Sequence, residues 1–114
     1  MEEAITAFQS LLEDVVRVLG PDHPSTLTTR SVFAGLLGGA GRVEEAITAF
    51  QSLLDDQLRV LGPDHPATLT TRSELAYWLA RAGRAEEAVT AFQALLNDRL
   101  RVLGPDHRLT QTTS

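Results

Sequence analysis

Three histidines are the residues whose type first suggests metal binding or acid–base chemistry. They are His23, His65 and His107, and each follows the same six residues, RVLGPD, at intervals of 42 residues. If each interval is one stacked structural unit, equivalent histidines lie about one helix diameter apart, roughly 10 Å, and the three do not converge on one ion. We therefore expect them to cap helices or to hydrogen-bond at chain corners. The alternative is a metal ion bridged between two of them or between chains.

Paired glutamates and Thr-Thr-Arg triplets are the other groups that could bind or react with a ligand. The pairs are Glu2-Glu3, Glu44-Glu45 and Glu86-Glu87, and the triplets are Thr28-Thr29-Arg30 and Thr70-Thr71-Arg72. The glutamates recur at the expected first turn of a helix, where a negative charge interacts favourably with the helix dipole. The triplets lack the glycine-rich loop and lysine of a nucleotide-binding loop, so we interpret them as helix surface. Because no pairing of a nucleophile with a base remains, the sequence predicts neither an enzyme nor a cofactor.

The composition indicates a small soluble protein of a reducing compartment. The 114 residues have a net charge of −5, a hydrophobic share of 43% and no cysteine. An acidic chain lacks the basic stripe that is typical of nucleic-acid-binding proteins. No apolar run approaches the roughly 20 residues of a membrane span, and the acidic start, Met-Glu-Glu-Ala, is unlike a signal peptide. We therefore expect a cytoplasmic protein with no nucleic-acid or membrane partner.

The chain is built from one repeated unit. Residues 2–43 and 44–85 align without a gap and are identical at 31 of 42 positions, and residues 86–114 begin a third copy. A fixed period of this length is typical of stacked repeats, in which each unit buries its apolar face against its neighbours. We therefore expect residues 1–114 to form a single repeat domain.

Each unit is expected to contain two helices. Apolar spacing predicts one helix over 44–61, equivalent to 2–19, and a second over 66–82, equivalent to 24–40. Comparison of the copies suggests which positions face solvent. Position 57 varies between Val15, Gln57 and Arg99, whereas position 58 stays apolar as Val16, Leu58 and Leu100. We therefore place position 57 on the solvent face and position 58 in the core.

The recurring RVLGPDHP stretch predicts a corner between the two helices. Gly20 supplies a residue that ends the first helix, Asp22 or His23 can cap the next one, and Pro24 fits its first turn. The helix that follows, 24–40, carries three glycines, Gly35, Gly38 and Gly39. Each costs about 0.5 to 1 kcal/mol relative to alanine, so we expect this helix to be the weakest of the full-length ones.

The pattern within each unit resembles the tetratricopeptide repeat. Leu75-Ala76-x-x-Leu79 followed by Ala88-x-x-x-Phe92 carries the resemblance, and Phe33-Ala34-x-x-Leu37 followed by Ala46-x-x-x-Phe50 is the earlier copy. The 42-residue period is similar to the longer variant found in kinesin light chains and in many bacterial regulatory proteins. Arg30 and Arg72 stand where the shorter repeat favours tryptophan.

This resemblance implies the fold and a binding surface. The expected fold is an all-α, right-handed α-solenoid of antiparallel helix pairs, with five full helices and a C-terminal stub. In tetratricopeptide arrays the first helix of each unit lines a concave groove that holds peptides. Carried over by motif position, the expected partner-binding residues are Thr28, Ser31, Thr70, Ser73, Tyr77 and Arg81. Ala80, Gly35, Gly38 and Gly39 fall on the same face, and an ordinary solvated surface is the alternative interpretation.

The two ends of the array predict a second kind of contact. The chain begins on the second helix of a unit, so no preceding helix is expected to cover Ile5, Phe8 and Leu12. At the other end, Arg108 replaces the first-turn proline and Gln111 replaces a core leucine, so the last helix is expected to fray. Self-association through the first helix, by two-fold pairing or by exchange of repeats, would cover its apolar stripe.

Two functional hypotheses remain, and they are compatible. The first is a non-catalytic module that binds a protein or peptide on the concave face. The second is a homo-oligomeric scaffold that assembles through the uncapped terminal helices. We expect both.

Overall fold

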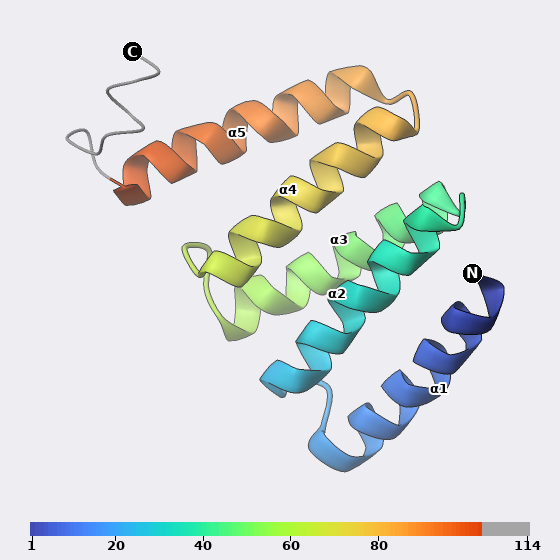
Figure 1. The fold of residues 1–114 in the computed structure, drawn as a ribbon. Helices are drawn as coiled ribbons and strands as arrows, with labels where there is room; N and C mark the ends of the chain where they lie inside the picture. The colour runs from blue at the N-terminus through green and yellow to red at the C-terminus, as the bar shows by residue number, and fades with distance from the viewer. Residues whose placement is uncertain (104–114) are drawn as a thin grey trace.

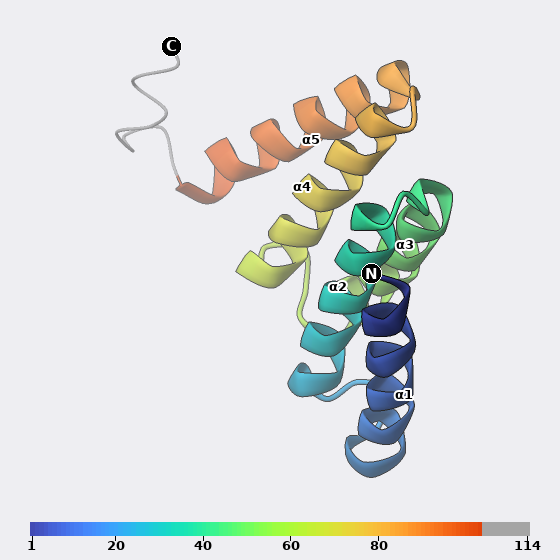
Figure 2. The same cartoon turned by 45° about the vertical axis from the view of Figure 1, so that its right-hand side comes forward.

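The computed structural model describes residues 1–103, which form five helices and no strand. The helices are α1 (Glu2–Leu19), α2 (Pro24–Gly39), α3 (Val43–Val60), α4 (Pro66–Arg81) and α5 (Ala85–Leu103). Consecutive helices run in opposite directions and stack side by side (Figure 1), and the second view shows the same order (Figure 2). The predicted all-α solenoid of antiparallel helix pairs is confirmed. The expected stub, with His107, Arg108 and Gln111, lies outside the described residues.

The corners between α1 and α2 and between α3 and α4 have the same construction. Gly20 and Gly62 both have φ of +89°, a region that glycine adopts at little steric cost. The Nδ1 atom of His23 accepts a hydrogen bond from the N–H of Ser25 at 3.0 Å, and His65 Nδ1 accepts one from Ala67 at 3.0 Å. Each bond satisfies an amide that the first helical turn leaves free. The expected capping role is therefore confirmed for both histidines.

The core runs along the stack, and α3 lies at its centre. Phe50 and Leu53 of α3 are buried with Leu27 and Ala34 of α2, and Trp78 of α4 packs against this cluster. Further clusters join Ile5 to Leu37 and Ala46, and Ile47 to Leu79 and Ala88. Because α3 packs against both α2 and α4, its side chains are covered on two sides. The end helices α1 and α5 each pack against one main neighbour.

The apolar stripe of α1 is covered, which corrects one prediction. Ile5 is buried against Leu37 of α2, and Phe8 and Leu12 are half-buried. The helix that follows α1 in the chain covers this face. A preceding helix would cover a different face, as the repeat shows: Leu53 of α3 is completely buried, whereas its equivalent Leu11 in α1 is 46% exposed. The expectation that Ile5, Phe8 and Leu12 form an exposed stripe was therefore wrong.

The assignment of positions 57 and 58 also needs correction. Gln57 is only 3% exposed, and Leu58 is 41% exposed. Gln57 continues the buried row of α3 that contains Ala46, Phe50 and Leu53, because these residues follow one another at helical spacing and face the neighbouring helices. Among the described residues, α1 and α5 each have one main neighbouring helix, whereas α3 has two, so the equivalent positions do not share one environment. Val15 is therefore half-buried, and Arg99 is exposed.

Candidate protein-interaction surface

A groove of about 330 Å³ lies between α2 and α4, with α3 at its base. Its lining residues are Pro24, Leu27, Thr28 and Ser31 from α2, Gln57 and Leu61 from α3 and its end, and His65, Ala67, Thr70 and Thr71 around the start of α4. The groove forms because equivalent ends of two repeats stand next to each other over the same helix. We call it the α2–α4 groove.

The structure brings together three of the six predicted partner-binding residues. Thr28, Ser31 and Thr70 all line the α2–α4 groove. Ser73 is half-buried on α4 and does not line it. Tyr77 and Arg81 are exposed and lie further along α4, at a rise of roughly 1.5 Å per residue beyond Thr70. The predicted surface is therefore a groove at one end of α4 and an exposed pair at the other.

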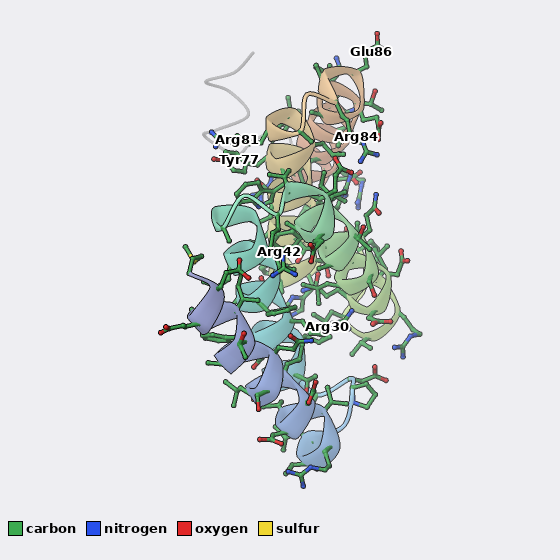
Figure 3. The ribbon with its side chains drawn as sticks, turned by 90° about the vertical axis from the view of Figure 1, so that its right-hand side faces the viewer. Arg30, Arg42, Tyr77, Arg81, Arg84 and Glu86 are labelled. Atoms are coloured by element: carbon green, nitrogen blue, oxygen red, sulfur yellow. The ribbon has the colours of Figure 1, made fainter. Side chains whose placement is uncertain are left out.

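Tyr77 and Arg81 project from α4 side by side (Figure 3). Tyr77 is 47% exposed, and its ring packs edge-on against the ring of Trp78, with centroids 4.9 Å apart and an interplanar angle of 82°. Such edge-to-face pairs contribute about 0.5 to 1.5 kcal/mol. That interaction favours one orientation of the Tyr77 ring, so less conformational entropy is lost when Tyr77 meets a partner. Arg81 has no ion-pair partner among residues 1–103, so its guanidinium is available to a partner.

Gln57 is a polar residue of the groove that the sequence did not predict. Its Oε1 atom is buried and has no hydrogen-bond partner within the described residues. A buried polar group without a partner costs about 1 to 3 kcal/mol. The equivalent position in α1 is Val15, so the repeat can be built with an apolar residue there. The only signal in the sequence was that the residue type at this position differs among the copies, as Val15, Gln57 and Arg99.

Most charged side chains near the groove are paired with one another. Arg30 Nη1 donates to Asp56 Oδ2 at 2.6 Å, and Arg72 pairs with Asp98 in the next unit. The hydrogen bond from Arg30 is the main reason why the pKa of Asp56 is lowered, and Arg59 contributes as well. These arginines stand where the shorter repeat favours tryptophan. Arg30 joins α2 to α3, and Arg72 joins α4 to α5.

A second set of ion pairs lies at the helix ends, two of them between neighbouring units and two within a unit. Arg59 pairs with Asp22 at 2.8 Å and Arg101 with Asp64 at 2.8 Å. Arg42 pairs with Glu2 at 3.1 Å and Arg84 with Glu44 at 3.2 Å. Glu2 and Glu44, the first glutamates of their pairs, therefore contact an arginine at the end of the same unit, in addition to their position at the helix N-terminus. Among the described residues, Glu86 has no equivalent arginine partner.

Two further features of the described residues bear on ligand classes. Within residues 1–103, no group of three or more histidines, aspartates and glutamates is placed to hold a metal ion. In the same residues, every helix is too short or too polar to cross a lipid bilayer.

The sequence and the fold were compared with known proteins. The family model of the tetratricopeptide repeat matches residues 1–57 and 33–97. No curated protein sequence matches the chain. Repeats of this family generally mediate protein–protein interactions, and they are typically non-catalytic.

Two solved structures have the same fold. Both are of a Podosopora anserina protein described as a kinesin light chain with nearly identical TPR-like repeats, and one of them is of a variant with a single substitution. Each has a TM-score of 0.81 and 23% sequence identity over 98% of this chain. The chain covers 53% of each of those chains, so it spans about half of their length.

Proposed function

We propose that this chain, which belongs to the tetratricopeptide repeat family, is a non-catalytic module that binds a protein or peptide segment along α2 and α4. The α2–α4 groove is the observation that carries the proposal, since it gathers Thr28, Ser31 and Thr70 from two repeats. Tyr77 and Arg81 extend the surface along α4. Tyrosine and arginine are among the residues that most often dominate binding energy at protein interfaces.

The proposal is tested with a peptide selected from a random library on the immobilised chain. We expect the double substitution Tyr77→Ala with Arg81→Ala to weaken binding of that peptide at least about tenfold, which is 1.4 kcal/mol. The matched control is Arg17→Ala with Val18→Ala, which removes one arginine and one exposed apolar side chain from α1. The proposal fails if the control weakens binding as much as the test pair, or if neither does.

Self-association is a second candidate function, and α5 favours it. Val89, Phe92 and Leu96 of α5 are 54%, 43% and 51% exposed. Their equivalents in α3 are covered: Ile47 and Phe50 are buried, and Leu54 is half-buried. An exposed apolar stripe therefore lies on α5, whereas the predicted residues of α1 are covered.

We infer that the stripe on α5 pairs with α5 of a second copy, running antiparallel. Val89, Phe92 and Leu96 follow the alternating spacing of three and four residues that two paired helices use. Glu86 precedes the stripe and Arg99 follows it, and neither has an ion-pair partner within residues 1–103. In an antiparallel pair, the acidic end of one helix lies beside the basic end of the other. The two-fold contact is thus complementary in charge as well as apolar.

Sedimentation over a hundredfold concentration range tests this second function. We expect a dimer that is abolished by Phe92→Glu, because the substitution buries a charge in the centre of the contact. Val18→Glu is the matched control, since Val18 is an exposed apolar residue on α1. A chain that stays monomeric throughout, or a Phe92→Glu chain that still dimerises, rules the contact out.

A further inference from the structure

Gln57 occupies a position where the fold does not need a polar residue. The row of α3 to which it belongs is otherwise apolar, with Ala46, Phe50 and Leu53. Its Oε1 atom has no hydrogen-bond partner in the described part of the chain, although the residue is almost completely buried. An unsatisfied buried group destabilises a fold unless something else completes its hydrogen bonds. Gln57 also lines the α2–α4 groove, so a molecule in that groove lies next to the carboxamide.

The carboxamide can turn toward the groove. The terminal torsion of a glutamine side chain is broad and roughly two-fold, and the carboxamide presents one acceptor and one donor atom. Rotation about this bond changes which of its polar atoms faces the groove without moving the helix. A ligand that donates a hydrogen bond would therefore supply the partner that Oε1 lacks.

The other residues that line the groove disfavour a charged ligand. None of its ten lining residues is an aspartate, a glutamate or an arginine. The Nδ1 atom of His65 is occupied in accepting the hydrogen bond from the N–H of Ala67. Arg30, next in sequence to Ser31, is held by Asp56 and Ser52. An ionised ligand would lose its hydration in the groove without meeting a counter-charge.

The size and the apolar walls indicate how much of a ligand enters. A volume of about 330 Å³ is at the lower end of the roughly 300 to 1,000 Å³ of small-molecule sites. Pro24, Leu27, Leu61 and Ala67 supply apolar surface, and the hydroxyl groups of Thr28 and Thr70 lie on the two helices that flank it. The space suits one aliphatic side chain and the peptide group next to it.

We propose that the α2–α4 groove binds an uncharged peptide segment, which inserts an aliphatic side chain and donates one hydrogen bond to the carboxamide of Gln57. This inference rests on the proposed function and adds the chemistry of the ligand to it. It also gives a role to the polar residue at the floor of the groove.

Three small probes test this chemistry on the intact chain. They are N-acetyl-leucine N-methylamide, which is neutral and has amide donors, N-acetyl-leucine, which is a carboxylate at neutral pH, and N-acetyl-lysine N-methylamide, which is a cation. Binding is followed by titration of the amide signals of Thr28, Thr70 and Thr71 in two-dimensional NMR spectra. We expect the neutral leucine probe to shift these signals and to bind at least about tenfold more tightly than the two charged probes.

Gln57→Val is the decisive variant, because Val15 is the equivalent residue of α1. We expect Gln57→Val to weaken the neutral probe at least about tenfold and to raise the urea midpoint of unfolding, since it removes an unsatisfied polar group. Gln51→Val makes the same change at an exposed position of α3 and should leave probe binding unchanged. A second variant, Thr70→Phe, fills the groove from its rim and should abolish binding while the helical circular dichroism is retained.

Other outcomes overturn the inference and are separable from failure of the proposed function. Equal binding of the charged probes, or unchanged affinity in Gln57→Val, excludes the hydrogen bond to Gln57. If the selected library peptide binds through Tyr77 and Arg81 while the neutral probe shifts no groove signal, the interaction function stands and the groove chemistry is wrong. If neither the peptide nor the probe binds, both proposals fail.

Discussion

The effect of Gly38 on helix stability depends on Trp78, its neighbour in the next repeat. A Cβ atom placed on Gly38 would lie 2.5 Å from Cζ2 of the Trp78 ring, whereas one placed on Gly35 meets nothing within 4 Å. The indole of Trp78 therefore packs directly against the backbone of α2. The sequence predicted three equivalent helix-weakening glycines. The structure separates them, and Gly38 makes room for the one tryptophan of the chain.

Alanine at these two glycines should have opposite effects on stability. We expect Gly35→Ala to raise the free energy of unfolding by about 0.5 to 1 kcal/mol, the usual gain for a helix interior. Gly38→Ala should lower it by about 1 to 3 kcal/mol through overpacking. Urea unfolding followed by circular dichroism measures both. In a Trp78→Leu background, which copies Leu36 of the earlier repeat, Gly38→Ala should no longer destabilise; a persistent loss would mean that another contact is responsible.

At the scale of the helix, periodicity predicted the elements well but assigned some faces incorrectly. Five helices, their corners and the two histidine caps follow from spacing and from the Gly-Pro-Asp-His-Pro stretch. The faces of α1 depend on which neighbour is missing, and periodicity within one helix does not contain that information. Comparison of copies failed at Gln57 for the same reason, because the three copies do not share one environment. Thr28, Ser31 and Thr70 were located by family resemblance, whereas Gln57 and Trp78 each occur in one copy only.

Ion pairs should stabilise the array only where their side chains are partly covered. The side chains of Arg30 and Asp56 are 18% and 34% exposed, whereas those of Arg17 and Asp14 are 72% and 63% exposed. A double-mutant cycle of Arg30→Met and Asp56→Asn should give a coupling energy of about 0.5 to 1 kcal/mol, toward the upper end of measured surface pairs. The cycle of Arg17→Met and Asp14→Asn should give a value near zero. Equal coupling in both cycles would show that burial does not decide the contribution.

Acid should destabilise the same contacts. The pKa of Asp56 is lowered mainly by its hydrogen bond with Arg30, and the pKa of Asp98 mainly by that with Arg72. A carboxyl whose folded-state pKa is depressed stabilises the fold above its unfolded pKa, near 3.9, and this contribution is lost as the pH falls through the folded-state value. We expect the urea concentration at the midpoint of unfolding to decrease as the pH drops below about 4. This decrease should be less steep in the Arg30→Met, Arg72→Met double variant. Identical pH profiles of the unsubstituted chain and the double variant would show that these carboxylates do not contribute to acid unfolding.

At the scale of the whole molecule, stability should vary along the stack. In a repeat array each unit is stabilised mainly by its immediate neighbours, so α3 is supported from two sides and α1 and α5 from one. The ion pairs follow the same rule: Arg59 and Arg101 each connect to the unit before them. Among residues 1–103, α5 packs mainly against α4, and apolar residues on its other face are exposed.

Hydrogen exchange should reveal which effect determines the weakest helix. Burying a large apolar side chain contributes about 1.5 to 3 kcal/mol to stability. Because three such side chains on α5 are about half exposed, α5 lacks about 2 to 4 kcal/mol of this stabilisation. Gly35 and Gly39 weaken α2 by about 1 to 2 kcal/mol together, because Gly38 is compensated by its packing against Trp78. We therefore expect the amides of α5 to exchange faster than those of α2, and those of α3 to exchange slowest.

Faster exchange in α2 than in α5 would show that the glycines dominate. Protection of α5 that rises with protein concentration would identify a second copy as its cover, and protection that does not change would leave α5 as the open end of a monomer.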